Sequence, residues 1–162
     1  MRRFTRKLLV GLATLATASG LSVNAAHAGL YDGIYNLNSG RCLGIANGLA
    51  GIWNCTTHPD QTWHWGAYFP YQYNYRQLIN GNGQCLGVQG GSTAQGARVV
   101  AWTCNGHEDQ YWFYNSTPDY TVSNYSSGMV LGVYGGSTAN GAAVVQWGGN
   151  GNGDQGWNVY FR

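Results

Sequence analysis

The sequence predicts an all-β protein in which one unit of about four short strands occurs three times and closes into a barrel. The first observation is a motif of Asp, Gln, any residue and Trp, which ends each unit, at 60–63, 109–112 and 154–157. Recurrence at a spacing of roughly 45 residues is typical of a repeated supersecondary unit. The second observation is that short β-branched or aromatic runs, such as 99–102 and 144–147, alternate with glycine-rich segments without a helical period.

Further blocks precede each motif in the same order. A second tryptophan lies ten residues before the motif tryptophan, at Trp53, Trp102 and Trp147. Upstream of it is a Leu-Gly pair, and the second and third units also share a Gly-Gly-Ser-Thr-Ala loop, at 90–97 and 135–142. These matched blocks place the repeats at about 35–66, 76–114 and 121–160. We therefore expect a single domain from 29 to 162, because a chain of this length closes one core.

Residues 1–28 have the pattern of a signal peptide that is cleaved. A basic start is followed by a mildly apolar run at 8–23 and by Ala26-His27-Ala28, a small-x-small cleavage pattern. A membrane anchor is the alternative, but the run is short and rich in small and polar residues for a bilayer span. The prediction is a secreted, extracellular protein.

The charge of the remaining chain excludes two classes of partner. After residue 28 the sequence has four arginines, no lysine and six acidic residues, which gives a net charge of −2. A protein without a basic cluster lacks the electrostatic footprint of nucleic-acid binders and of proteins that bind anionic membranes. We expect no nucleic acid as partner and no membrane insertion.

The four cysteines form one pair in each of the first two units: Cys42 with Cys55, and Cys85 with Cys104. In an exported protein this arrangement predicts two local disulfides. Zinc ligation is the alternative, but no Cys-x-x-Cys spacing occurs, and equivalent places in two units favour one bridge each. The third unit has Val130 and Gly149 at these places, so packing alone must hold it.

The set of motifs resembles that of the ricin B-type lectins, the R-type or Gln-x-Trp repeat proteins. Repeats of that family carry a Cys-Leu block near the start, a Trp-x-Cys block in the middle and Gln-x-Trp near the end. This chain is similar from about Tyr35 to Arg162. The resemblance implies a β-trefoil with three pseudo-symmetric repeats, in a carbohydrate-binding protein of the secreted bacterial type.

The resemblance gives the two sets of tryptophans different roles. The tryptophans of the Gln-x-Trp motifs correspond to the family's core residue: Trp63, Trp112 and Trp157. The tryptophans ten residues earlier correspond to an aromatic platform on which a sugar ring lays its C–H face: Trp53, Trp102 and Trp147. For this second set, packing against a neighbouring loop is the alternative.

The polar half of the family's site is altered in this chain. The family's aspartate after the Leu is replaced by Gly44, Gly87 and Gly132, whereas the family's asparagine before Gln-x-Trp is an aspartate in every repeat. A carboxylate from this second place can enter the same pocket from the opposite loop. We therefore predict two carbohydrate-binding sets: Trp102, Asn105, Asp109 and Gln110, and Trp147, Asn150, Asp154 and Gln155. For the aspartates, a turn residue bonded to its own backbone is the alternative.

The first repeat has fewer features of a binding site. Nine positions separate Gly44 from Trp53, against fifteen in the other repeats, so the loop that we expect to wall the pocket is missing. Its weaker candidates are Trp53, Asp60 and Gln61. A tyrosine-rich tract at 68–75 follows, and it is either an exposed recognition surface or a β-hairpin that caps the barrel.

No motif indicates an enzyme, a metal site or a cofactor. The repeated aspartates lie in separate repeats rather than as the paired acids of a glycosidase, and no Gly-x-Ser-x-Gly motif occurs. We expect a non-catalytic protein whose partner is a glycan or polysaccharide. The alternative is a degenerate trefoil that binds a partner protein, as an inhibitor or as the targeting subunit of a secreted toxin or enzyme assembly.

Overall fold

Twelve strands form one antiparallel sheet that is rolled into a β-trefoil, so the predicted fold class is confirmed. The computed structural model describes residues 32–161, and the predicted signal peptide lies outside them. The first repeat contributes β1 (Gly33–Asn36), β2 (Cys42–Ala46), β3 (Leu49–Trp53) and β4 (Trp63–Phe69). The second contributes β5 (Gln72–Asn80), β6 (Cys85–Val88), β7 (Val99–Trp102) and β8 (Tyr111–Asn115). The third contributes β9 (Thr121–Asn124), β10 (Val130–Val133), β11 (Ala142–Trp147) and β12 (Trp157–Tyr160).

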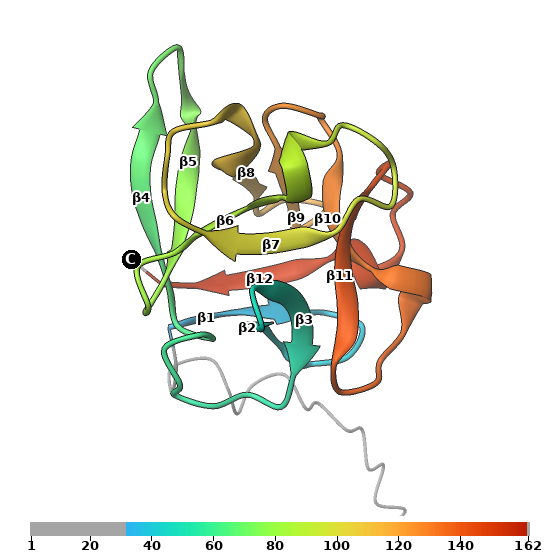
Figure 1. The fold of residues 1–162 in the computed structure, drawn as a ribbon. Helices are drawn as coiled ribbons and strands as arrows, with labels where there is room; N and C mark the ends of the chain where they lie inside the picture. The colour runs from blue at the N-terminus through green and yellow to red at the C-terminus, as the bar shows by residue number, and fades with distance from the viewer. Residues whose placement is uncertain (1–31, 162) are drawn as a thin grey trace, which may run out of the picture.

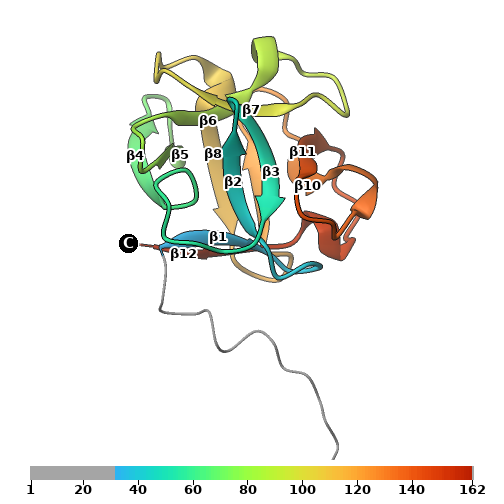
Figure 2. The same cartoon turned by 60° about the horizontal axis from the view of Figure 1, so that its bottom comes forward.

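The first and last strands of the repeats make the barrel. They pair as β4 with β5, β8 with β9, and β12 with β1, and β5 also pairs with β8. Figure 2 shows β1 and β12, from opposite ends of the chain, side by side. Two further backbone hydrogen bonds help to close the barrel. The Trp63 N–H donates to the Asp32 carbonyl, and the Trp157 N–H donates to the Tyr120 carbonyl. The three repeats therefore share one closed wall.

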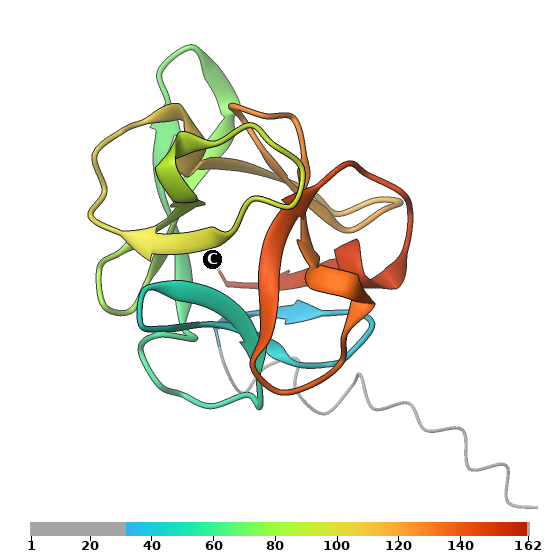
Figure 3. The ribbon, with the colours of Figure 1, turned by 45° about the vertical axis from the view of Figure 1, so that its right-hand side comes forward.

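The remaining hairpins, β2–β3, β6–β7 and β10–β11, cover one end of this barrel. Strand β3 pairs with β7 at Leu49↔Val100 and with β11 at Ala142↔Ile52. An isolated bridge between Arg98 and Val145 joins the second and third hairpins. The three hairpins surround the pseudo-three-fold axis in Figure 3, with β3 in teal, β7 in yellow and β11 in orange-red.

The three motif tryptophans lie in the common core. Trp63, Trp112 and Trp157 are at most 1% exposed. Their indole N–H groups donate to the carbonyls of Leu43, Leu86 and Leu131 at 3.0, 2.9 and 3.0 Å. A buried indole needs such a partner, and the same bond in every repeat places each ring in the same way.

The two predicted disulfides, Cys42–Cys55 and Cys85–Cys104, are confirmed, each with a Cα–Cα distance of 5.0 Å. Four short 3₁₀ turns interrupt the described chain: η1 (Gln89–Gly91), η2 (Glu108–Gln110), η3 (Tyr134–Gly136) and η4 (Gly153–Gln155). Within residues 32–161, no helix has the length and apolar character needed to cross a membrane.

The tyrosine-rich tract forms a hairpin, β4–β5, that projects beyond the barrel (Figure 1). Next to its turn, where Phe69 pairs with Gln72, the ring of Phe69 packs on Tyr111 and Tyr125, with centroids 4.9 and 4.1 Å away. At its tip Tyr71 and Tyr73 are 85% and 76% exposed. Both alternatives for this tract therefore describe part of it, since Phe69 packs on neighbouring side chains while Tyr71 and Tyr73 are exposed to solvent.

Candidate functional site

Each repeat builds the same local frame below its platform tryptophan. The platform ends the third strand of the repeat, and a loop follows that returns to the Asp-Gln pair just before the core tryptophan. The buried Gln155 amide donates to the Gly148 carbonyl at 2.9 Å and accepts from the Asn150 N–H at 2.8 Å. Gln61 and Gln110 make the equivalent bonds in their repeats. These glutamines lie under the surface and hold the loop that carries the asparagine and aspartate side chains.

The third repeat has a cleft of about 430 Å³ that is lined by all four residues predicted for it. Trp147 and the exposed Tyr134 provide two aromatic rings, and Val145 adds an apolar wall. The polar side chains are those of Asn150, Asn152 and Asp154. An apolar wall with a few convergent polar groups is the usual make-up of a small-ligand site.

Tyr134 and Asn152 were not predicted from the sequence. Tyr134 begins η3, is 62% exposed and lines the cleft. The signal was present in the duplicated loop, because the equivalent residue of the second repeat is Gln89 in an otherwise nearly identical segment. The change from an amide to a large aromatic ring gives the third-repeat cleft an aromatic surface that the second repeat lacks at this place.

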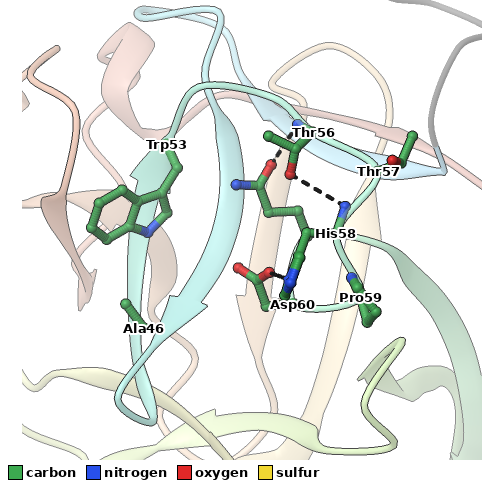
Figure 4. A pocket seen from close by; sticks show the side chains of 8 residues that line it. Ala46, Trp53, Thr56, Thr57, His58, Pro59 and Asp60 are labelled. Carbon is green, nitrogen blue, oxygen red and sulfur yellow. Dashed lines mark hydrogen bonds and ion pairs between the residues drawn. The ribbon is translucent and has the colours of Figure 1, made fainter.

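The first repeat has a cleft of about 540 Å³, lined mainly by Trp53, Thr56, His58 and Asp60. Figure 4 shows the Trp53 indole on one side and the Asp60 carboxylate and His58 ring on the other, with the ring Nδ1 bonded to the Asp60 Oδ1. The Trp53 Nε1 is buried and has no hydrogen-bond partner among residues 32–161. This repeat, which has the fewest sequence features of a site, nevertheless has a cleft.

The second repeat is arranged differently. Asp109 is only 3% exposed, and its Oδ2 accepts the Val88 N–H at 3.0 Å. Burial raises the pKa of this carboxyl above its ordinary value, although the hydrogen bond from Val88 opposes the rise. The cleft of about 260 Å³ beside Trp102 runs instead toward the first-repeat turn that contains Asn47. The structure therefore brings Asn150 and Asp154 to Trp147, but it places Asp109 and Gln110 below the surface near Trp102.

The repeated aspartates lie beside the glycines that replace the family's aspartate. A Cβ atom added at Gly87 would lie 2.7 Å from the Asp109 Oδ2, and one added at Gly132 would lie 3.6 Å from the Asp154 Oδ2. The repeated aspartates thus enter, from the opposite loop, the space that a side chain at these glycines would occupy. Asp109 is also more than a turn residue bonded to its own backbone, because it accepts the Val88 N–H from strand β6.

The described residues contain no group of three His, Cys, Asp or Glu side chains that could hold a metal ion. In the first-repeat cleft the His58 Nδ1 is hydrogen-bonded to the Asp60 Oδ1, and the histidine is mostly exposed to solvent. The clefts therefore present aromatic rings, amides and single carboxylates, which suit hydrogen bonding to a neutral polar ligand.

Comparison with solved structures identifies the fold. The designed three-fold symmetric protein ThreeFoil superposes with a TM-score of 0.73 at 24% identity, over 80% of this chain and 97% of that one. The agglutinin of Rhizoctonia solani gives 0.68 at 16% identity, over 80% and 92%. The exo-β-1,3-galactanase 1,3Gal43A of Clostridium thermocellum gives 0.72 at 24% identity, and the match covers 80% of this chain but only 30% of the enzyme.

No curated protein sequence matches this chain. The sequence profile of the ricin-type β-trefoil lectin domain, in contrast, matches residues 31–157, which include all three repeats. The chain therefore belongs to the ricin-type β-trefoil lectin domain family, a family of carbohydrate-binding domains.

Proposed function

We propose that this chain is a secreted, non-catalytic lectin that binds glycan on the aromatic platforms of its second and third repeats, with the third repeat as the principal site. The observation that supports this most is the third-repeat cleft. It combines two exposed or half-exposed aromatic rings, Trp147 and Tyr134, with the amides of Asn150 and Asn152 and the carboxylate of Asp154. A pyranose ring has an apolar C–H face and a rim of hydroxyls, and it needs both kinds of surface.

Different residues have different roles in this proposal. Trp147 and Tyr134 contact the C–H face of the sugar, and Asp154 accepts hydrogen bonds from adjacent hydroxyls, since a carboxylate is a stronger acceptor than an amide. Asn150 contributes from the loop above, and the buried Gln155 positions that loop. In the second repeat, Trp102 and Asn105 are exposed and form the contact surface, while Asp109 and Gln110 support them from below.

Isothermal titration after glycan-array identification of a ligand tests the proposal. We expect Asp154→Asn and Trp147→Ala each to weaken binding at least about tenfold, a loss of about 1.4 kcal/mol. Tyr134→Gln, which installs the residue of the second repeat, should weaken it by about fivefold, the size of one aromatic contact. Asp119→Asn, an exposed carboxylate outside the clefts, is the control. Undiminished binding in all three site variants would show that the third repeat is not the site.

Export is tested separately. Mass spectrometry of the protein recovered from the culture medium should show a chain that starts at Gly29 if residues 1–28 are a cleaved signal peptide. Full-length protein that remains with the cells would argue against secretion.

The hairpin tip favours a second candidate, the binding of a partner protein. Tyr68, Tyr71 and Tyr73 are 51%, 85% and 76% exposed on a projection that the other repeats lack. Exposed tyrosines combine large contact area with a polar tip and are common in protein-recognition surfaces. Pull-down from native culture medium with the parent and with Tyr71→Ser plus Tyr73→Ser distinguishes the candidates. A partner retained by the parent and lost by the double variant supports the protein interface, whereas equal recovery excludes the tip from it.

A further inference from the structure

We infer that the platform tryptophans of the third and first repeats are positioned by the loop of the neighbouring repeat, the second and the third respectively, so each of these platforms is held in place by two repeats. The inference rests on the proposed function for its consequence in glycan binding. It concerns the two homologous loops 90–97 and 135–142, hereafter the second-repeat loop and the third-repeat loop. The start of the third-repeat loop lines the cleft of the third repeat, as expected. The end of this loop lies on Trp53 of the first repeat.

One glycine at the end of each loop lies directly on the neighbouring indole ring. A Cβ atom added at Gly96 would lie 3.1 Å from the Cζ3 of Trp147, and one added at Gly141 would lie 3.2 Å from the Cη2 of Trp53. Both glycines have a left-handed backbone, with φ of 83° and 84°. A side chain at either place would strain the backbone and push against the ring, so each glycine allows a contact that no other residue allows.

Hydrogen bonds fix the second-repeat loop to the third repeat. The Gly96 N–H donates to the Gln146 carbonyl at 2.9 Å. The fully buried Gln146 side chain returns two bonds, to the carbonyls of Ser92 at 2.8 Å and Ala94 at 2.9 Å. Because Gln146 immediately precedes Trp147, these bonds hold the loop against the platform.

The third-repeat loop is fixed to the first repeat in the same way. The Gly141 N–H donates to the carbonyl of Ile52, the residue before Trp53, at 2.7 Å. The Asn140 Oδ1 accepts the Asn54 N–H at 2.7 Å, and the Arg41 Nε donates to the Thr138 carbonyl at 2.8 Å. Residues on both sides of Trp53 are thus held by the third repeat.

The first repeat provides the natural comparison, because its loop is six residues shorter. The place equivalent to Gly96 and Gly141 is Asn47, and the tryptophan that a first-repeat loop would cover is Trp102. Trp102 is 39% exposed, whereas Trp53 and Trp147 are half-buried. The cleft beside Trp102 is lined by Asn47, Gly48 and Leu49, where the other repeats have the covering loop. Absence of the loop therefore coincides with a more exposed platform.

Contact between the loop and the platform tryptophan has a consequence for ligand binding. A platform that is already held in place loses little conformational freedom when a ligand stacks on it, so less of the interaction energy is lost to ordering. Gly96 and Gly141 are positioning residues in this sense, since neither lines the third-repeat or first-repeat cleft. The site in one repeat then depends on a residue in another.

The experiment compares Gly96→Ala with Gly141→Ala in ¹⁵N-labelled full-length protein. The platform indole N–H signals are assigned through Trp→Phe variants and need no ligand. We expect Gly96→Ala to shift the Trp147 signal but not that of Trp53, and Gly141→Ala to do the reverse. Gly128→Ala is the matched control, because its φ is 68° but a Cβ there meets nothing within 4 Å, and it should shift neither.

Milder variants cover the case in which a glycine variant does not fold. Gln95 and Asn140 occupy equivalent exposed places, and their side chains accept the N–H groups of Gly148 and Asn54. Gln95→Ala and Asn140→Ala should give the same crossed pattern with smaller shifts. Equal effects on both indole signals, or no effect from either pair of variants, would overturn the inference.

Glycan titration then separates this inference from the proposed function. In Gly96→Ala, third-repeat affinity should fall by about fivefold or more, the loss of one well-placed aromatic contact, and in Gly141→Ala it should not change. If no glycan binds the parent, the proposed function fails, while the crossed indole pattern still supports positioning by the neighbouring repeat.

Discussion

At the scale of single residues, the recurring Gln-x-Trp motif is explained by bonds inside the protein. The tryptophan fills the core and donates to a leucine carbonyl, and the glutamine satisfies the backbone of the loop below the platform. A buried backbone group without a partner is costly, so the glutamine is needed in every repeat whether or not that repeat binds a ligand. The aspartate before it differs among repeats, since Asp109 is buried but Asp154 lines a cleft.

Replacement of Gln155 by Ala should destabilise the protein by about 1 to 3 kcal/mol, because two backbone groups of the loop lose their partner. Urea denaturation measures this change. Gln72→Ala, in an exposed strand end, should change the unfolding free energy by less than about 0.5 kcal/mol. Equal effects would contradict the supporting role of Gln155.

Replacement of Asp109 by Asn should raise the melting temperature at pH 7 by several degrees. The pKa of the Asp109 carboxyl is raised by burial, so the folded protein loses stability as the pH rises from the unfolded-state pKa, about 4, through the higher folded-state pKa. The asparagine amide can still accept the Val88 N–H but never ionises.

The difference between Asp109→Asn and the parent should therefore shrink as the pH falls through the unfolded-state pKa, about 4, because the Asp109 carboxyl becomes neutral in both the folded and the unfolded state. Melting curves from pH 3 to pH 8 measure it, with Asp119→Asn as the exposed control. A constant difference across this range would exclude ionisation of Asp109 as the cause.

At the scale of elements, the repeats differ in how their central hairpins are held. The first two are closed by the disulfides Cys42–Cys55 and Cys85–Cys104. The third has Val130 and Gly149 there, and a Cβ at Gly149 would lie 3.9 Å from the Val130 Cγ1, so this end is packed without a bridge. Its hairpin is held instead by the second-repeat loop, through Gln146.

Removal of the second disulfide, by Cys85→Ala with Cys104→Ala, should lower the unfolding free energy by about 3 kcal/mol, the loop-entropy value for a bridge of this span. Chemical denaturation gives the total, and hydrogen exchange shows where protection is lost. We expect the largest loss in β6 and β7. Uniform loss across all three repeats would contradict a local effect of the bridge.

At the scale of the whole molecule, the repeats are not independent units. Strand β12 pairs with β1, β3 contacts both other hairpins, and the three core tryptophans belong to one buried cluster. The loops add a further connection, from the second repeat to the third and from the third to the first. A molecule joined in this way is expected to unfold in one cooperative transition.

Replacement of any one core tryptophan by Phe should therefore lower the midpoint of the same single transition. Each of Trp63→Phe, Trp112→Phe and Trp157→Phe loses an indole hydrogen bond and leaves a small cavity, at a cost of about 2 kcal/mol. Calorimetry measures the midpoint and the cooperativity. A separate low-temperature transition in any variant would show that its repeat unfolds alone.

The sequence by itself determined the triplicated β fold and both disulfides, and its resemblance to the ricin B-type lectins implied the core tryptophans and the third-repeat cluster of Trp147, Asn150 and Asp154. The repeats and the cysteine pairs depend on local spacing within a repeat, so periodicity reveals them, and the matched motifs then carry the resemblance. Only the tertiary structure decided that Asp109 is buried, that the first repeat has a cleft, and that Gly96 and Gly141 lie on tryptophans of the neighbouring repeat. These properties depend on which repeats meet around the three-fold axis, and contacts between residues 51 positions apart, or 88, leave no local pattern in the chain.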